Sequence, residues 1–119
     1  MKKLTKTLYF LSLFIILSCT SGVNIEITND SKIDVKKIVI KTGFSTHTLD
    51  TLKMNEIKTI FIPFNNKEVR FDGIMGLYIY RNHTTTSSDY NFGYYSNGIP
   101  PEDMKIIIKD DTVIFKQVN

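Results

Sequence analysis

Three side chains in the sequence could supply a thiol or an imidazole to chemistry: Cys19, His47 and His83. A single cysteine excludes an intrachain disulfide and a cysteine-based metal cluster. Neither histidine lies in a paired-ligand motif, so a zinc site would need carboxylates that folding brings to it. We therefore expect no metal site and no cofactor, with both histidines on loops or on an edge strand.

Catalytic motifs are also missing from the sequence. No serine lies in a nucleophile elbow or in a recognisable hydrolase pattern. Gly73 and Gly76 do not form a phosphate-binding loop, because neither the partner residues nor a following helix is present. The acid pairs at 102–103 and 110–111 fall in predicted turns, where solvation or capping explains them better than acid–base catalysis. We expect that the protein is not an enzyme.

Cys19 follows a segment with the features of an export signal. Lys2, Lys3 and Lys6 make the first residues positively charged, and residues 8–17 are almost entirely apolar. A helix of that length spans about 15 Å, roughly half the hydrocarbon core of a bilayer. The segment is therefore too short to cross a membrane comfortably and is typical of the apolar region of a signal peptide.

The residues Ile16-Leu17-Ser18-Cys19 resemble the lipobox of bacterial lipoproteins. The resemblance implies that the Cys19 thiol is diacylated through a thioether and that signal peptidase II cleaves just before it. The predicted organisation is a signal peptide over 1–18, a lipidated cysteine and short tether over 19–22, and a folded domain over 23–119. Each buried methylene contributes about 0.8 kcal/mol, so several acyl chains on Cys19 would hold the protein at a membrane.

Removal of the signal peptide changes the charge balance. The whole chain has 15 Lys and Arg against 12 Asp and Glu. Three of the lysines and none of the acids lie in residues 1–18, so the remaining domain has no formal net charge. A neutral domain lacks the basic surface that nucleic-acid binding requires, so we expect no nucleic-acid partner.

The domain is predicted to consist of short strands. Apolar and polar residues alternate, and Asn, Asp, Gly and Pro separate the runs. The predicted strands are 23–27, 35–41, 45–52 (an edge strand), 56–62, a short run at 69–71, 77–81, 90–95, 104–109 and 112–116. They predict an all-β fold after a cleaved helical signal peptide. We expect a seven- to eight-stranded antiparallel β-sandwich, immunoglobulin-like or transthyretin-like, with a small barrel as the alternative.

Tyrosines are the candidate ligand-binding residues. Tyr78 and Tyr80 would share one face of their strand. Tyr90 and Tyr94 would share one face of the next strand, with Tyr95 on the opposite face. Facing inward, these rings would belong to the core. Facing outward, they would form a flat aromatic platform for sugar rings or a protein partner.

The same predicted strand and the turn after it contain the segment Phe92-Gly93-Tyr94-Tyr95-Ser96-Asn97-Gly98. Gly93 would let a ligand approach closely or would mark a β-bulge, and Asn91 and Asn97 are possible polar contacts. Together with the Asn-, Lys- and Ile-rich composition, the segment resembles small lipoproteins of Bacteroidetes-type bacteria. That resemblance implies no particular activity.

The anchor and the missing catalytic motifs together predict a membrane-anchored envelope lipoprotein. Its domain would be a non-catalytic binding or structural module for an envelope protein or a glycan. The alternatives are an immunity or inhibitor lipoprotein against an envelope-acting toxin or hydrolase, and an enzyme acting on glycans or peptidoglycan. Thr20 rather than Asp follows Cys19, and Ser21-Gly22-Val23 contains no acid. These residues predict attachment to the outer membrane facing the periplasm, or an outward-facing domain in a host with one membrane.

Overall fold

The part of the chain that the structure describes folds into eight β-strands. The computed structural model describes residues 21–64, 72–81 and 86–118. The strands are β1 (Gly22–Asn29), β2 (Val35–Lys41), β3 (Thr46–Leu49), β4 (Ile57–Pro63), β5 (Gly73–Arg81), β6 (Ser88–Tyr95), β7 (Met104–Ile108) and β8 (Val113–Gln117). The predicted signal peptide, Cys19, the short run at 69–71 and His83 lie outside the described residues.

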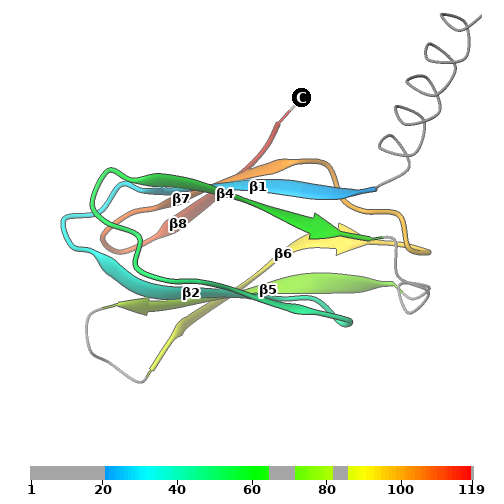
Figure 1. Ribbon diagram of the computed structural model, residues 1–119, viewed down its shortest axis with the longest axis horizontal. Helices are drawn as coiled ribbons and strands as arrows, with labels where there is room; N and C mark the ends of the chain where they lie inside the picture. The colour runs from blue at the N-terminus through cyan, green and yellow to red at the C-terminus, as the bar shows by residue number, and fades with distance from the viewer. Residues whose placement is uncertain (1–20, 65–71, 82–85, 119) are drawn as a thin grey trace, which may run out of the picture.

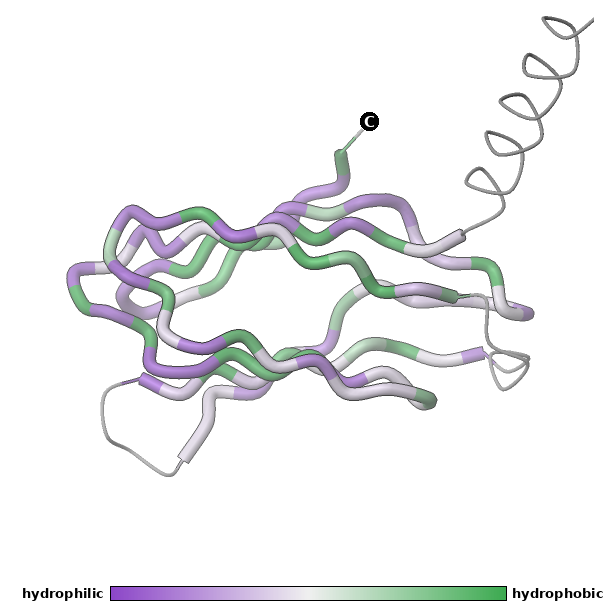
Figure 2. The backbone as a smooth tube through the Cα atoms, in the orientation of Figure 1, coloured by the Kyte–Doolittle hydropathy of each residue, from purple (hydrophilic) through white to green (hydrophobic). Residues whose placement is uncertain are grey.

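Side chains along the strands alternate between the core and the solvent. In β1, Val23, Ile25 and Ile27 are fully buried, while Asn24 between them is exposed. This period of two follows from the pleat of a strand, which points successive side chains to opposite faces. Figure 2 shows hydrophobic and hydrophilic residues alternating along the other strands as well.

The strands form two four-stranded sheets packed as a sandwich (Figure 1). The first sheet has the order β4-β1-β7-β8 and the second the order β3-β2-β5-β6. The predicted all-β sandwich is therefore confirmed. One strand pair departs from the antiparallel expectation, because β1 and β7 are parallel neighbours, with Ile25 opposite Met104. Each connection reverses the chain, so the odd-numbered strands run in one direction and two of them side by side must be parallel.

The strand order separates the two predicted kinds of sandwich. An immunoglobulin domain holds its first two strands in the same sheet. Here β1 lies in the first sheet and β2 in the second. The strand order therefore differs from that of an immunoglobulin domain, which leaves the transthyretin-like alternative.

The core between the sheets is largely aliphatic. Its fully buried members come from β1, β2, β4, β5 and β7 and the loop after β3: Val23, Ile25, Ile27, Val35, Ile38, Ile40, Leu52, Ile62, Met75, Leu77, Ile79, Ile106 and Ile108. Aromatic rings close one long side. The Phe115 ring of β8 stacks on Phe92 of β6 at 5.3 Å and contacts Tyr90 at 6.1 Å. These contacts join an edge strand of one sheet to an edge strand of the other.

Aromatic rings also close the end of the sandwich where β1 begins at Gly22 and β6 ends at Tyr95. We name it the proximal end. Phe44, Phe64 and Tyr95 pack edge to face there, with ring centroids 5.0 to 5.8 Å apart. The Tyr95 hydroxyl also accepts a 3.0 Å hydrogen bond from the backbone N–H of Gly43. Since Phe64 follows the first sheet and Tyr95 ends the second, this cluster ties the two sheets together.

Polar contacts close the opposite end, where β1 ends at Asn29 and β2 begins at Val35. We name it the distal end. The Asn29 side-chain nitrogen donates to the carbonyl oxygens of Ile33 and Leu52, at 2.9 and 3.0 Å. Its oxygen accepts from the backbone N–H of Ser31 at 3.1 Å. Asn29 is fully buried, so these bonds satisfy a polar side chain that the core alone could not accommodate.

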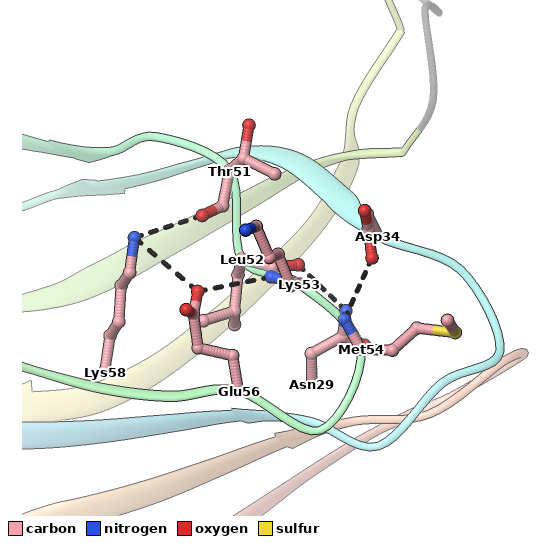
Figure 3. A network of polar contacts seen from close by, with 8 residues as sticks. All are labelled: Asn29, Asp34, Thr51, Leu52, Lys53, Met54, Glu56 and Lys58. Atoms are coloured by element: carbon pink, nitrogen blue, oxygen red, sulfur yellow. Dashed lines mark hydrogen bonds and ion pairs between the residues drawn. The ribbon is translucent and has the colours of Figure 1, made fainter.

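The loop between β3 and β4 is fixed by its own set of hydrogen bonds (Figure 3). The Asp34 carboxylate accepts from the backbone N–H of Met54 at 2.9 Å. The Lys58 ammonium donates to the carbonyl oxygen of Thr51 at 3.0 Å. This loop carries the chain from the second sheet back to the first. Its contacts therefore connect the two sheets at the distal end.

Lys109 makes a further link at the distal end. Its carbonyl oxygen accepts a 2.7 Å hydrogen bond from the Arg81 guanidinium of the second sheet. Its ammonium forms a 2.7 Å ion pair with Asp30. The hydrogen bond and the charge of Asp30 raise the pKa of the Lys109 ammonium above its ordinary value.

Candidate binding face

The outer face of the second sheet carries the two tyrosines of β5. Tyr78 and Tyr80 point away from the core and are half-buried. Leu77 and Ile79, which alternate with them, are fully buried. Both tyrosines therefore lie on a sheet surface that faces solvent.

A lysine of β2 lies over each of these rings. The Lys37 nitrogen is 4.5 Å from the centroid of the Tyr80 ring, and the Lys41 nitrogen is 5.0 Å from that of Tyr78. The register between β2 and β5 causes these contacts, because it places Lys37 directly opposite Tyr80. Each contact contributes about 0.5–1 kcal/mol at an exposed site. We name these four side chains the tyrosine–lysine face.

The absence of a side chain at Gly76 makes room for the second of these pairs. Gly76 lies opposite Lys41 in the register of the sheet. A Cβ atom at Gly76 would come within 3.0 Å of the ring carbon Cε2 of Tyr78. The Tyr78 ring therefore lies against the backbone of Gly76, within reach of the lysine.

Neutral and acidic groups border the tyrosine–lysine face. Val39 lies between the lysines and is 8% exposed, flanked by Tyr78 and by Thr48 of the edge strand β3. On the other side, β6 presents Asp89 opposite Tyr78, and Asn91 follows on the same face. The face therefore combines two ammonium groups and two phenol hydroxyls with a carboxylate and an amide at its border. Such a set can bind a partner through hydrogen bonds and charge.

The tyrosines of β6 do not extend this face. Tyr90 packs against the core, Tyr95 is buried, and Tyr94 is 62% exposed. The expected arrangement, with Tyr90 and Tyr94 on one face and Tyr95 on the opposite one, is therefore not the observed one. The five candidate tyrosines are divided between the core and the surface.

A β-bulge at Gly93 explains the difference. The pairs Gly73–Tyr95 and Met75–Phe92 are three residues apart along β6 but only two residues apart along β5. The extra residue shifts the side-chain alternation by one, and Gly93 adopts a φ of 65°. Of the two roles expected for Gly93, the structure shows the bulge.

The structure also places a serine beside a histidine. Ser45 Oγ lies 3.0 Å from His47 Nε2, and the Thr42 hydroxyl oxygen accepts from the Ser45 backbone N–H at 2.8 Å. Sequence reasoning missed this pair, although its spacing of two residues in a predicted edge strand was a possible signal. No carboxylate among the described residues is hydrogen-bonded to His47, so the pair lacks the third member of a hydrolytic triad. These bonds close the turn between β2 and β3.

The described residues contain neither a cluster of metal ligands nor a membrane-spanning helix. Within residues 21–64, 72–81 and 86–118, no three His, Cys, Asp or Glu side chains gather as ligands for a metal ion. The same part of the chain contains no helix long and apolar enough to cross a membrane.

Comparison with known proteins supports the fold. No family model matches the chain, and no curated protein matches it. An NMR structure of a protein from Eubacterium rectale is similar, with a TM-score of 0.56. The similarity covers 82% of this chain and 91% of that one at 15% sequence identity. At that identity it shows a shared sandwich architecture.

Proposed function

We propose that the protein is a lipid-anchored envelope lipoprotein whose sandwich is a non-catalytic binding module for an envelope protein. The tyrosine–lysine face is the proposed contact surface. The observation that carries the proposal is the pairing of two outward tyrosines with two lysines on one open sheet face.

The chemistry of the face favours a partner with acidic groups. Tyrosine is enriched where proteins bind one another, because its ring supplies contact area and its hydroxyl a hydrogen bond. Lys37 and Lys41 add positive charge at the centre of the face. Complementary charge on a partner would speed association and fix its orientation.

The same geometry favours a protein over a neutral glycan. A sugar that stacks on a tyrosine needs the face of the ring. Lys37 and Lys41 lie over the rings of Tyr80 and Tyr78. A stacking sugar would have to displace both ammonium groups and lose about 0.5–1 kcal/mol for each contact.

The anchor is proposed from the lipobox residues Ile16-Leu17-Ser18-Cys19. β1 begins at Gly22, so the folded domain starts three residues after the proposed lipid. Acyl labelling of the wild type and of Cys19→Ala in the native host tests this part. We expect label and membrane fractionation in the wild type alone. Equal label in both proteins would refute the anchor.

Site-specific photo-crosslinking in the intact lipoprotein tests the binding face. The probe replaces Thr48, which is exposed on the outer face of the second sheet. The matched control replaces Thr59, which is exposed on the outer face of the first sheet. We expect a discrete crosslinked protein from position 48 and none from position 59. Equal products from both positions would contradict the proposal.

Charge reversal then shows whether the crosslink depends on the face. The double variant Lys37→Glu/Lys41→Glu should abolish the product. The control Lys105→Glu/Lys116→Glu reverses two lysines that lie opposite each other on the first sheet, and it should retain the product. A crosslink that survives the first double variant would show that the tyrosine–lysine face is not the contact surface.

A further inference from the structure

Large hydrophobic side chains are exposed at the proximal end. The described residues expose eight such side chains: Ile33, Met54, Ile57, Phe61, Ile74, Tyr94, Ile99 and Val118. Five of them come from segments at the proximal end: Phe61, Ile74, Tyr94, Ile99 and Val118. The two most exposed of all, Ile99 at 67% and Tyr94 at 62%, are in this group.

A tight turn holds the most exposed of these residues in place. Asn97 and Gly98 both have positive φ, at 50° and 73°, and the Ile99 N–H donates to the Ser96 carbonyl at 2.9 Å. Positive φ at both central residues is the geometry of a type I′ turn, for which Asn-Gly is the preferred sequence. The Asn97 N–H also donates to the Asp72 carboxylate at 2.9 Å. Ile99 is therefore presented on a fixed tip, and in Figure 1 the segment between β6 and β7 extends beyond the start of β1.

The sequence segment that carries Tyr94 and Ile99 contains no charged residue. Residues 90–101 contain no Lys, Arg, Asp or Glu. Ile74 lies across the bulge from Tyr94, so two exposed apolar side chains are adjacent on the sheet. At the distal end the exposed Ile33 and Ile57 stand between charged sequence neighbours, Lys32 and Asp34 around Ile33 and Glu56 and Lys58 around Ile57. The exposed apolar side chains of the two ends therefore differ in the charge of their sequence neighbours.

The chain also approaches its proposed lipid from the proximal end. Cys19 precedes Gly22 by three residues, and an extended chain covers at most about 3.3–3.6 Å per residue. The Cα atom of Cys19 can therefore lie no more than about 11 Å from that of Gly22, where β1 starts. The exposed ring of Phe61 lies against Gly22 at this point. A tether this short brings the proximal end to the membrane surface.

We propose that the proximal end rests in the interfacial layer of the bilayer that holds the Cys19 lipid. Ile99 and Tyr94 would enter the headgroup region, with Ile74 and Phe61 beside them. Tyrosine favours this region because its ring is apolar and its hydroxyl polar. Burial of exposed apolar surface contributes about 25 cal/mol per Å². The inference rests on the proposed lipidation and adds an orientation to it.

The contact does not depend on anionic lipid. The acids at the proximal end include Asp72 and Asp103, and both are hydrogen-bonded within the domain, to Asn97 and to Asn24. Acids near the surface would oppose a purely electrostatic attraction to anionic headgroups. The proposed contact is therefore apolar and should form on a zwitterionic bilayer.

This orientation leaves the proposed binding face in water. The sandwich stands on its proximal end, with its strands running away from the membrane. β1 has 8 residues, which at about 3.3 Å per residue make a strand about 26 Å long. The distal end would lie at about that height, and the tyrosine–lysine face would be accessible from the side.

The absence of tryptophan from the sequence allows a direct test. Two single-tryptophan variants of the full chain, Ile99→Trp and Met54→Trp, place an indole at the proximal and the distal end. Both positions are exposed, at 67% and 50%, so the substitutions should not disturb the core, and matching unfolding curves check this. The lipidated proteins are reconstituted into phosphatidylcholine vesicles with and without brominated acyl chains.

We expect the Ile99→Trp emission to shift to shorter wavelength on reconstitution and to be quenched by brominated lipid several-fold more than that of Met54→Trp. Equal, weak quenching of both variants in acyl-labelled, vesicle-bound protein would overturn the orientation and leave the anchor standing. A wild-type chain that carries no acyl label and does not bind vesicles would refute the anchor, and the orientation with it.

Discussion

The side-chain nitrogen of Asn29, at the end of β1 in the first sheet, donates a 3.0 Å hydrogen bond to the carbonyl oxygen of Leu52, just beyond β3 of the second sheet. Both residues are fully buried. The bond therefore joins the two sheets at a place that water does not reach.

Asn29→Ala should lower the free energy of unfolding by about 3 kcal/mol, the upper part of the range for leaving a buried polar group unpaired. The reason is that the carbonyl of Ile33 and the N–H of Ser31 lose the same partner. Urea unfolding measures the change. Asn24→Ala, on the exposed face of the same strand, should stay within about 0.5 kcal/mol of the wild type. Equal losses at the two positions would contradict the role of Asn29.

Gly93→Ala should destabilise the protein by about 1–2 kcal/mol, because a left-handed backbone costs that much for residues other than glycine. The added Cβ would also meet the Met75 methyl group. Thermal unfolding followed by circular dichroism checks the loss. Asn91→Ala, two residues earlier and exposed, is the control and should be close to neutral. A fully stable Gly93→Ala protein would show that the bulge does not require glycine.

Phe115→Ala should cost about 3 kcal/mol, near the lower end for phenylalanine truncations because the ring is half-buried. The substitution removes the stacking on Phe92 and the contact with Tyr90 that join β8 to β6. Chemical denaturation compares it with Phe61→Ala, whose ring is 40% exposed on the outer face of the first sheet. A smaller loss at Phe115 than at Phe61 would argue against a closing role for this ring.

The ion pair of Lys109 predicts a dependence on pH. The hydrogen bond and charge of Asp30 raise the pKa of the ammonium above 10.5 in the folded protein. The contribution of the pair is therefore complete below about pH 10.5 and is lost as the pH rises through the folded-state value. The difference in unfolding midpoint between wild type and Lys109→Gln should be small at pH 7 and should diminish further as the pH rises above the raised folded-state pKa of Lys109. Because the pair is at the surface, 1 M NaCl should also diminish the difference. A difference that grows at high pH would contradict this assignment.

The sandwich was predictable because burial follows the apolar alternation of the strands. The residues Val23, Ile25 and Ile27 show this pattern in the sequence and are all buried. The order of strands in the sheets could not be predicted in this way, because it depends on which strands meet in space. The parallel neighbours β1 and β7 leave no mark in either strand, so the antiparallel expectation failed there.

The binding face was predictable only in part. Alternation along β5 already places Tyr78 and Tyr80 on one face. Their lysine partners depend on the register between β2 and β5, which the sequence does not show. The position of Tyr94 was misjudged because one extra residue at Gly93 shifts the alternation of β6. A single bulge thus separates tyrosines that a regular strand would have kept together.

The parallel pairing of β1 with β7 also bears on when the domain can fold. A hydrogen bond between Asn24 and Asp103 joins residues 79 positions apart. β1 lies inside its sheet, between β4 and β7, so its second edge stays unpaired until the last third of the chain is present. Pairing over such distances along the chain makes folding slow. A chain of this topology cannot complete the sheet around β1 before β7 is made, and this delay would suit the proposed export of the chain in an unfolded state.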